Sequence, residues 1–259
     1  MNNFIEKIVS EKKESLRSKK VKQPVSQLEH MLTRIPKVRG FKNAITNPNK
    51  FNIIGEVKKA SPSAGIIRHA YEVGKLSKEL EEAGVSAISV LTEEKYFHGD
   101  LFHLIRVYDS VIVPILRKDF IIDEYQIIEA RVYFADAVLL IAELLSQQQL
   151  TDYLALSRKL GLDAIVELHN EAQVEKVLNA NPDIIGINNR DLDTFQVDLK
   201  TTLKIKKLLP ADKIIVSESG MKTRADIYKL KEAGINAALI GEALMRSGNI
   251  KSKVMEFTS

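Results

Sequence analysis

Short apolar runs alternate with amphipathic stretches from residue 51 to the end of the chain. The apolar runs are almost continuous and rich in β-branched residues, which is typical of strands covered on both faces, as in parallel sheets. The amphipathic stretches follow helical spacing. The pattern predicts strands over 51–57, 86–91, 112–116, 137–141, 163–168, 184–187, 213–217 and 237–240, and helices over stretches that include 76–83, 124–133, 150–160 and 225–233.

The joints between helix and strand also repeat. The segments EAGVSA (82–87) and EAGINA (232–237) are near copies, and KLGLDA (159–164) is similar to both. Each glycine stands where a helix can end in a left-handed conformation before the next strand begins. Eight strand–helix units predict an α/β fold of the closed (β/α)8, or TIM-barrel, type. An open doubly wound sheet is the alternative, but its glycine-rich dinucleotide fingerprint is absent after the first predicted strand.

The first 48 residues differ from the rest because they are basic and lack strand-like runs. Apolar residues at positions 4, 5, 8 and 9 follow helical spacing, and prolines at 24, 36 and 48 interrupt the segment. Its apolar residues are too few for a core of its own. We therefore expect a single domain over 1–259, in which an N-terminal helical extension (1–48) precedes the barrel (49–259).

Composition and charge exclude several classes of protein. The chain has no cysteine, so disulfides, thiolate metal sites and cysteine nucleophiles are excluded. The first residues lack a signal-peptide core and no apolar run is long enough to cross a bilayer, so a soluble cytoplasmic protein without a membrane partner is expected. Lys+Arg 38 exceed Asp+Glu 34 by only 4, and the basic stretch 7–22 lacks interleaved aromatic residues. A solvated helix face is therefore favoured over a nucleic-acid contact.

Polar residues gather at the predicted carboxyl ends of the strands, where barrel enzymes carry their active sites. Each set also has a purely structural interpretation: an ion pair at a frayed strand end, a hydrogen-bonded wall histidine, or an arginine that caps a helix or pairs with Asp191. Period-2 alternation puts two such residues on one face of each of three strands: Glu56 with Lys58, Glu167 with His169, and Asn188 with Arg190.

Two adjacent basic residues, Arg117 and Lys118, follow the third predicted strand. Only one of them can face the barrel interior if the strand stays regular, because neighbouring side chains point to opposite faces. Parity alone does not decide which one does.

Two glycines, Gly220 and Gly241, follow the last two predicted strands. In barrels these loops commonly bind phosphate through backbone N–H groups, which need glycine for close approach. A tight turn explains either glycine alone, but the paired placement favours a phosphate site.

The predicted rim combines three basic with three acidic side chains. A metal site is less favoured, because the basic groups would compete with the ion. We expect acid–base chemistry on a small phosphorylated substrate, with lysine as acid or charge stabiliser and glutamate as base. The six residues are Lys58, Lys118, Arg190, Glu56, Glu167 and Glu218.

Several separate motifs occur in order along almost the whole chain. They are EVKKASPS (56–63), LT (91–92) with Phe97, LRKDF (116–120), ELH (167–169), INNRDL (187–192) and SESG (217–220). Together they closely resemble the indole-3-glycerol phosphate synthase family. The resemblance implies closure of the pyrrole ring of 1-(2-carboxyphenylamino)-1-deoxyribulose 5-phosphate, with loss of CO2 and water, in tryptophan biosynthesis. It implies no organic cofactor and no metal.

The resemblance also implies roles for individual residues. Lys118 would be the general acid that assists attack of the aromatic ring on the ketone, and Glu167 the base in the dehydration. It selects Lys118 over Arg117, because lysine can release a proton near neutral pH where arginine effectively cannot. Lys58 would stabilise charge or take the role of acid in place of Lys118, Glu56 would orient that lysine, and Glu218 would complete the catalytic set. The residues implied to bind substrate are Asn188 and Arg190 for its polar groups, Ser61, Gly220 and Gly241 for the phosphate, and Phe97, Phe120 and Leu192 for the anthranilate ring. Ser219 and Glu242 would make further contacts with the substrate.

Asp100 and Asn170 depart from the family pattern, in which serine and an acidic residue are frequent at these positions. Another phosphate-binding barrel enzyme, such as phosphoribosylanthranilate isomerase, is the main alternative, and the absence of cysteine counts against it. An RNA-binding protein would carry its charge on an outer surface, and a bare scaffold leaves the polar rim unexplained. We expect a monomer, and we hypothesise that the extension covers the barrel mouth and helps to bind substrate.

Overall fold

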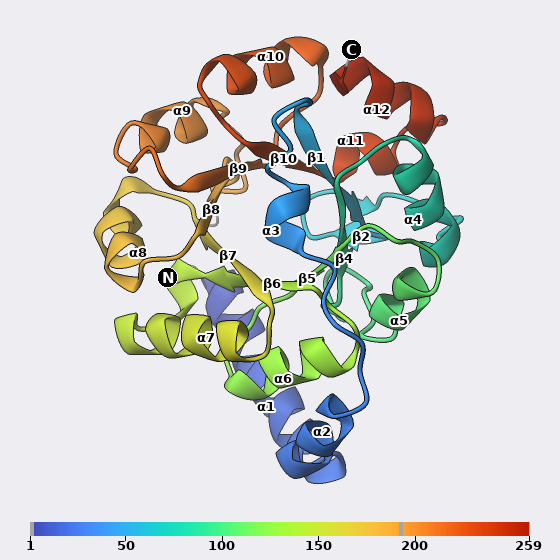
Figure 1. Cartoon of the computed structure of the whole chain (residues 1–259), viewed down its shortest axis with the longest axis vertical. Helices are drawn as coiled ribbons and strands as arrows, with labels where there is room; N and C mark the ends of the chain where they lie inside the picture. The colour runs from blue at the N-terminus through green and yellow to red at the C-terminus, as the bar shows by residue number, and fades with distance from the viewer. Residues whose placement is uncertain (1–2, 192–193, 259) are drawn as a thin grey trace.

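The computed structural model describes residues 3–191 and 194–258, and within them eight parallel strands close into a barrel. The order around the barrel is β1-β10-β9-β8-β7-β6-β5-β4, so strands that follow one another along the chain are neighbours (Figure 1). The predicted (β/α)8 fold is confirmed and the open-sheet alternative is wrong. The strands are β1 (Asn52–Val57), β4 (Ala87–Leu91), β5 (Ile115–Lys118), β6 (Ala137–Ile141), β7 (Asp163–Leu168), β8 (Ile184–Asn188), β9 (Ile214–Glu218) and β10 (Ala237–Ile240).

Helices cover the outside of the barrel (Figure 1). The glycines of the three repeated joints, at 84, 161 and 234, all have positive φ, as predicted. A short hairpin, β2 (Ala60–Ser61) with β3 (Gly65–Ile66), follows β1. The helices are α4 (Val73–Glu82), α5 (His103–Tyr108), α6 (Glu124–Val132), α7 (Gln147–Lys159), α8 (Val174–Ala180), α9 (Lys200–Lys206), α10 (Arg224–Glu232), α11 (Glu242–Met245) and α12 (Ile250–Thr258), with 3-10 turns η1 (Ala142–Leu144) and η2 (Glu171–Gln173).

The third strand begins later than its β-branched residues predict. The prediction of 112–116 is wrong, because β5 runs from Ile115 to Lys118. Ile112 is 84% exposed, and the N–H groups of Ile112 and Val113 donate to Glu81 Oε1 on α4 instead of to a neighbouring strand. Lys118 is consequently the last residue of the strand and not part of the loop.

One end of the barrel is closed by the chain itself. Helix α3 (Phe41–Ala44) lies at the centre of the ring of strands in the view of Figure 1. Phe41 and Ile45 are fully buried in the apolar cluster of the barrel interior. The Lys42 N–H donates to Asp163 at the start of β7 (2.7 Å). This closure leaves the carboxyl ends of the strands as the open end.

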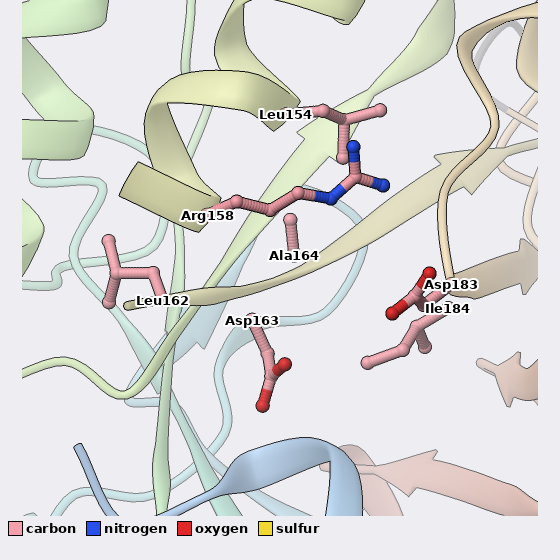
Figure 2. A pocket seen from close by; sticks show the side chains of 7 residues that line it. All are labelled: Leu154, Arg158, Leu162, Asp163, Ala164, Asp183 and Ile184. Carbon is pink, nitrogen blue, oxygen red and sulfur yellow. The ribbon is translucent and has the colours of Figure 1, made fainter. Parts of the chain in front are cut away.

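A small pocket lies beside the amino ends of β7 and β8 (Figure 2). Arg158, Asp163 and Asp183 supply its charged groups. Its volume of about 30 Å³ accommodates one or two water molecules but no organic substrate.

The extension packs directly on the barrel through helices α1 (Asn3–Lys22) and α2 (Val25–Leu32). Leu16 and Leu28 join Tyr125 and Ile128 of α6 in an apolar cluster. The basic face of α1 is not simply solvated as expected, because Lys12 pairs with the buried Asp119 (2.8 Å). Among the helices of residues 3–191 and 194–258, none is long and apolar enough to cross a membrane.

Candidate active site

A cavity of about 1200 Å³ opens at the carboxyl ends of the strands. Its walls contain every site residue predicted from the sequence except Leu192, which lies outside the described residues. The predicted residues that line it are Glu56, Lys58, Ser61, Phe97, Lys118, Phe120, Glu167, Asn188, Arg190, Glu218, Ser219, Gly220, Gly241 and Glu242.

Lys118 lies between two buried carboxylates. Its Nζ is 3.0 Å from Glu167 Oε2 and 2.6 Å from Glu218 Oε2, and its side chain is 17% exposed. Burial alone would lower the pKa of Lys118, but the interactions with Glu167 and Glu218 outweigh burial and raise it above its ordinary value. Lys118 is held as an ammonium group, a charged proton donor at the centre of the cavity.

Arg117 points to the opposite face of β5. It is 2% exposed and contacts Asp119 (3.2 Å) and Glu129 (2.9 Å) between the strands and α6. This ion-pair network satisfies the buried guanidinium in the outer layer. The structure thus resolves what parity left open, because Lys118 faces the cavity and Arg117 does not.

Glu56 and Lys58 form an ion pair on β1 and just beyond it. Lys58 Nζ lies 2.6 Å from Glu56 Oε1, and the Glu56 side chain is only 4% exposed. The backbone of Gly241 has an ordinary φ of −120°, but a Cβ there would collide with Glu56 Oε1. Gly241 is therefore required by its contact with Glu56, whatever its role toward phosphate.

The end of β8 and the loops after β8 and β9 carry further polar groups of the site. Arg190 donates through one guanidinium nitrogen to Ser63 Oγ (3.3 Å) and to the Phe195 carbonyl (3.1 Å), while Asn188 Oδ1 accepts from the Arg190 N–H (3.0 Å). Ser219 and Gly220 both have positive φ, 65° and 93°. This backbone turn brings Ser219 and Gly220 to the cavity wall.

Two aromatic rings lie near the extension, because the residues that precede them, Tyr96 and Asp119, contact α1. The ring centroids of Phe97 and Phe120 are 6.3 Å apart and tilted by 48°. Ile5 of α1 also lines the cavity. The cavity is therefore apolar toward α1 and charged around Lys118.

Comparison with known proteins decides the family. The family model for indole-3-glycerol phosphate synthase matches residues 5–257. The chain belongs to the indole-3-glycerol phosphate synthase family. Relatives with this name include proteins of Caldanaerobacter subterraneus subsp. tengcongensis, 47% identical over 97% of each chain, Desulfotalea psychrophila, 44% identical over 96% of each, and Acetivibrio thermocellus, 44% identical over 98% of each.

Solved structures of other enzymes share the fold of this family member. The 3-hexulose-6-phosphate synthase of Salmonella typhimurium superimposes with a TM-score of 0.64 at 11% identity, over 80% of this chain and 96% of that one. Thiamine phosphate pyrophosphorylase from Pyrococcus furiosus gives 0.60 at 13% identity, over 81% and 94%. At such identities the likeness concerns the fold alone.

The two departures from the indole-3-glycerol phosphate synthase pattern have local structural roles. Asp100 Oδ1 accepts the Phe102 N–H (2.8 Å) just before α5, and Asn170 Oδ1 accepts the Ala172 N–H (3.1 Å) at the start of η2. Asn170 is thus the N-cap of η2, whereas Asp100 stabilises the turn that precedes α5.

One residue that the sequence reasoning overlooked is Glu143, on η1 after β6. Its carboxylate accepts the His169 N–H (2.9 Å) and lies against the His169 ring. Strand alternation contained a signal, because Glu143 is two residues beyond Ile141, which faces the barrel interior. However, β6 ends at Ile141, and the turn η1, not a strand, positions Glu143.

Proposed function

We propose that this chain catalyses the ring closure of 1-(2-carboxyphenylamino)-1-deoxyribulose 5-phosphate to indole-3-glycerol phosphate, with release of CO2 and water. The observation that carries the proposal is the contact of the Lys118 ammonium with Glu167 and Glu218 inside a cavity that also offers an aromatic wall. This is the set of groups that a condensation, a decarboxylation and a dehydration require: a proton donor, a base and stabilisation of charge.

The first step makes the carbon–carbon bond. The ring carbon that bears the carboxylate attacks the ketone carbon, and Lys118 donates a proton to the ketone oxygen as that oxygen becomes a hydroxyl. The carboxylate then leaves as CO2, and its bonding electrons restore the aromatic ring. Phe97 and Phe120 would hold the aromatic ring in place, which removes the cost of orienting the two carbons.

The second step eliminates water. The new hydroxyl takes a proton as it leaves, from Lys58 or from Lys118 once Lys118 has regained a proton from solvent, and Glu167 accepts the proton lost from the carbon bonded to nitrogen. Glu56, 2.6 Å from Lys58, orients that lysine. The carboxylate of Glu167 is available for this role because burial, which would raise its pKa, is outweighed by Lys118 and His169, which lower it.

We assign the phosphate to the loops after β9 and β10. Gly220 and Gly241 would supply backbone N–H groups, and Ser219 and Glu242 lie beside them on the cavity wall. Ser61 supports the assignment, because its buried Oγ has no hydrogen-bond partner within the described residues. Asn188 and Arg190 would contact the hydroxyl groups of the substrate.

We propose that the chain acts as a monomer, because the acid Lys118, the base Glu167 and the loops assigned to the phosphate already line one cavity together. The substrate would be a diffusible small molecule, and we place the reaction in the cytoplasm, where such metabolites are made and used.

The test is direct. The purified protein is mixed with the carboxyphenylamino ketose phosphate, and the fluorescence of the indole product is followed. We expect fluorescence to rise with the wild-type chain and not with Lys118→Met. Phosphoribosylanthranilate serves as a second substrate. Isomerisation of this substrate, with no indole-3-glycerol phosphate from the first one, would favour the isomerase alternative and overturn the proposal.

A further inference from the structure

Three ionisable side chains form a line behind the cavity wall. Glu143 Oε2 lies 3.2 Å from His169 Nδ1, and His169 Nε2 lies 3.1 Å from Glu167 Oε1. The side chains of Glu143, His169 and Glu167 are 12%, 4% and 3% exposed. The line joins η1 to the end of β7 and ends on the carboxylate proposed as base.

Only one member of this line reaches the cavity. Glu167 lines it, whereas His169 and Glu143 are not among its lining residues. The two oxygens of Glu167 are divided between two cations, because Oε2 contacts Lys118 and Oε1 contacts His169. Any effect of Glu143 on the substrate must therefore pass through His169 and Glu167.

The charges around His169 keep the imidazole protonated. Burial alone would lower the pKa of His169, but Glu143 and Glu167 raise it to about 10. The other charged groups nearby are engaged elsewhere: Lys118 and Glu218 contact each other beyond Glu167, and Lys176 of α8 donates to the Ala142 carbonyl (2.7 Å). Within the described residues, Glu143 is thus the one carboxylate that contacts His169 from outside the catalytic cluster.

We infer that Glu143 is a positioning residue: it keeps His169 charged and oriented, so that the imidazolium fixes Glu167 Oε1 while balancing its charge. The inference rests on the proposed function, because it needs Glu167 as the base. Glu143 makes two separable contacts with His169. Its negative charge faces the imidazole ring, and its Oε1 accepts a hydrogen bond from the backbone N–H of His169 (2.9 Å). The first orients the base, whereas the second only shapes the loop.

Glu143→Gln separates these contacts, because the amide keeps an acceptor oxygen but loses the charge. We expect kcat to fall roughly tenfold, as for a slightly misplaced base, with little change in KM. The loss should be greater at alkaline pH. Because Glu143 helps to raise the pKa of His169, that pKa should be lower without the Glu143 charge, so the alkaline limb of kcat should move to lower pH.

Glu81→Gln is the matched control. The Glu81 carboxylate also accepts backbone N–H groups, those of Ile112 and Val113, and its side chain is 11% exposed, but it lies on α4 outside the barrel. We expect this variant to keep both the kcat and the pH profile of the wild type.

The titration of His169 gives a readout that does not depend on activity. NMR of 15N-histidine-labelled protein, with the His169 signal assigned by its loss in His169→Asn, should show a lower pKa in Glu143→Gln than in the wild type. If the wild type makes indole-3-glycerol phosphate but Glu143→Gln keeps its pH profile and its His169 pKa, Glu143 only shapes the loop and the inference is wrong. A wild type that makes no indole-3-glycerol phosphate would instead reject the proposed function.

Discussion

Glu218 Oε1 occupies the space that a side chain at Gly186 would fill. Gly186 faces the interior from β8, and a Cβ there would collide with this oxygen and lie 2.8 Å from the Ile165 Cγ2 methyl. The hollow lets Glu218, which is fully buried, turn its other oxygen to within 2.6 Å of Lys118. A residue with no side chain thus sets the position of a charged group on the neighbouring strand.

Gly186→Ala should therefore move Glu218 away from Lys118. We expect kcat to fall about tenfold or more, because a shift on the order of an ångström at the acid is costly, and KM to change less. Gly248→Ala is the matched control, since a Cβ at Gly248 meets nothing within 4 Å. Adding Ile165→Leu removes the second clash. If that double variant regains full turnover, core packing and not Glu218 explains the loss.

Lys118→Met and Glu167→Gln test the acid and the base. We expect each to lower kcat by about 10²-fold or more, which is typical for lost acid–base assistance. Lys118→Met also leaves Glu167 and Glu218 without their shared cation, so its melting temperature should fall more than that of Glu167→Gln. Circular dichroism establishes folding. A folded variant with wild-type turnover would remove its residue from the mechanism.

Glu218 predicts a pH dependence of stability. Burial and the nearby charge of Glu167 outweigh Lys118 and raise the pKa of Glu218 to about 8, from an ordinary 4.5. Between these values the unfolded chain has lost this proton and the folded chain keeps it, so the contribution of Glu218 to stability falls as pH rises from about 4.5 to 8. The pKa of Glu167 is lowered instead, so the contribution of Glu167 to stability falls as the pH drops below its ordinary pKa of 4.5.

Glu218→Gln removes the ionisable group, and with it the loss of stability that Glu218 causes as pH rises. The melting temperature of the variant, relative to the wild type, should therefore rise between pH 5 and pH 8, by roughly 3 °C or more. Calorimetry at several pH values measures the difference. A difference that stays constant with pH would show that Glu218 is ionised in the folded chain throughout this range.

Local patterns predicted most of the fold because each strand run is bounded by its own signals. Outside the third strand, the predicted and observed strand bounds differ by no more than one residue. The prediction of the third strand was wrong at its start, because the β-branched residues around Ile112 resemble a strand. The N–H groups there instead donate to Glu81, a residue about thirty positions away. A partner so distant in sequence leaves no trace in local periodicity.

In the candidate site, too, local patterns predicted the contacts within one strand but not those between distant segments. Alternation placed Glu56 with Lys58 on one face, and the two are in contact. It could not choose between Arg117 and Lys118, because the choice depends on Glu129 of α6, which pairs with the arginine. Nor could it reveal why residue 241 is glycine, since the reason is Glu56 on a strand almost two hundred residues earlier.

The extension is tied to the loop that carries the acid. Lys12 of α1 lies 2.8 Å from Asp119, the residue after Lys118, and Ile5 lines the cavity. The other carboxylate oxygen of Asp119 accepts a hydrogen bond from the Thr92 hydroxyl (2.6 Å), which fixes Asp119 on the barrel. The ion pair of Lys12 with Asp119 therefore joins α1 to a fixed point of the barrel. Deleting residues 1–40 would also remove Arg39, which donates to the Val111 carbonyl (2.7 Å), so a point variant gives the cleaner test.

Lys12→Met should loosen α1 over the cavity while leaving the barrel intact. We expect KM to rise on the order of 3–10-fold, corresponding to about 1 kcal/mol of helix docking, and kcat to change less. Lys13→Met, on the exposed side of the same helix turn, is the control and should match the wild type. Steady-state kinetics at low and moderate salt measure both. Unchanged KM in Lys12→Met, or an equal rise in Lys13→Met, would mean that this ion pair does not couple the extension to substrate binding.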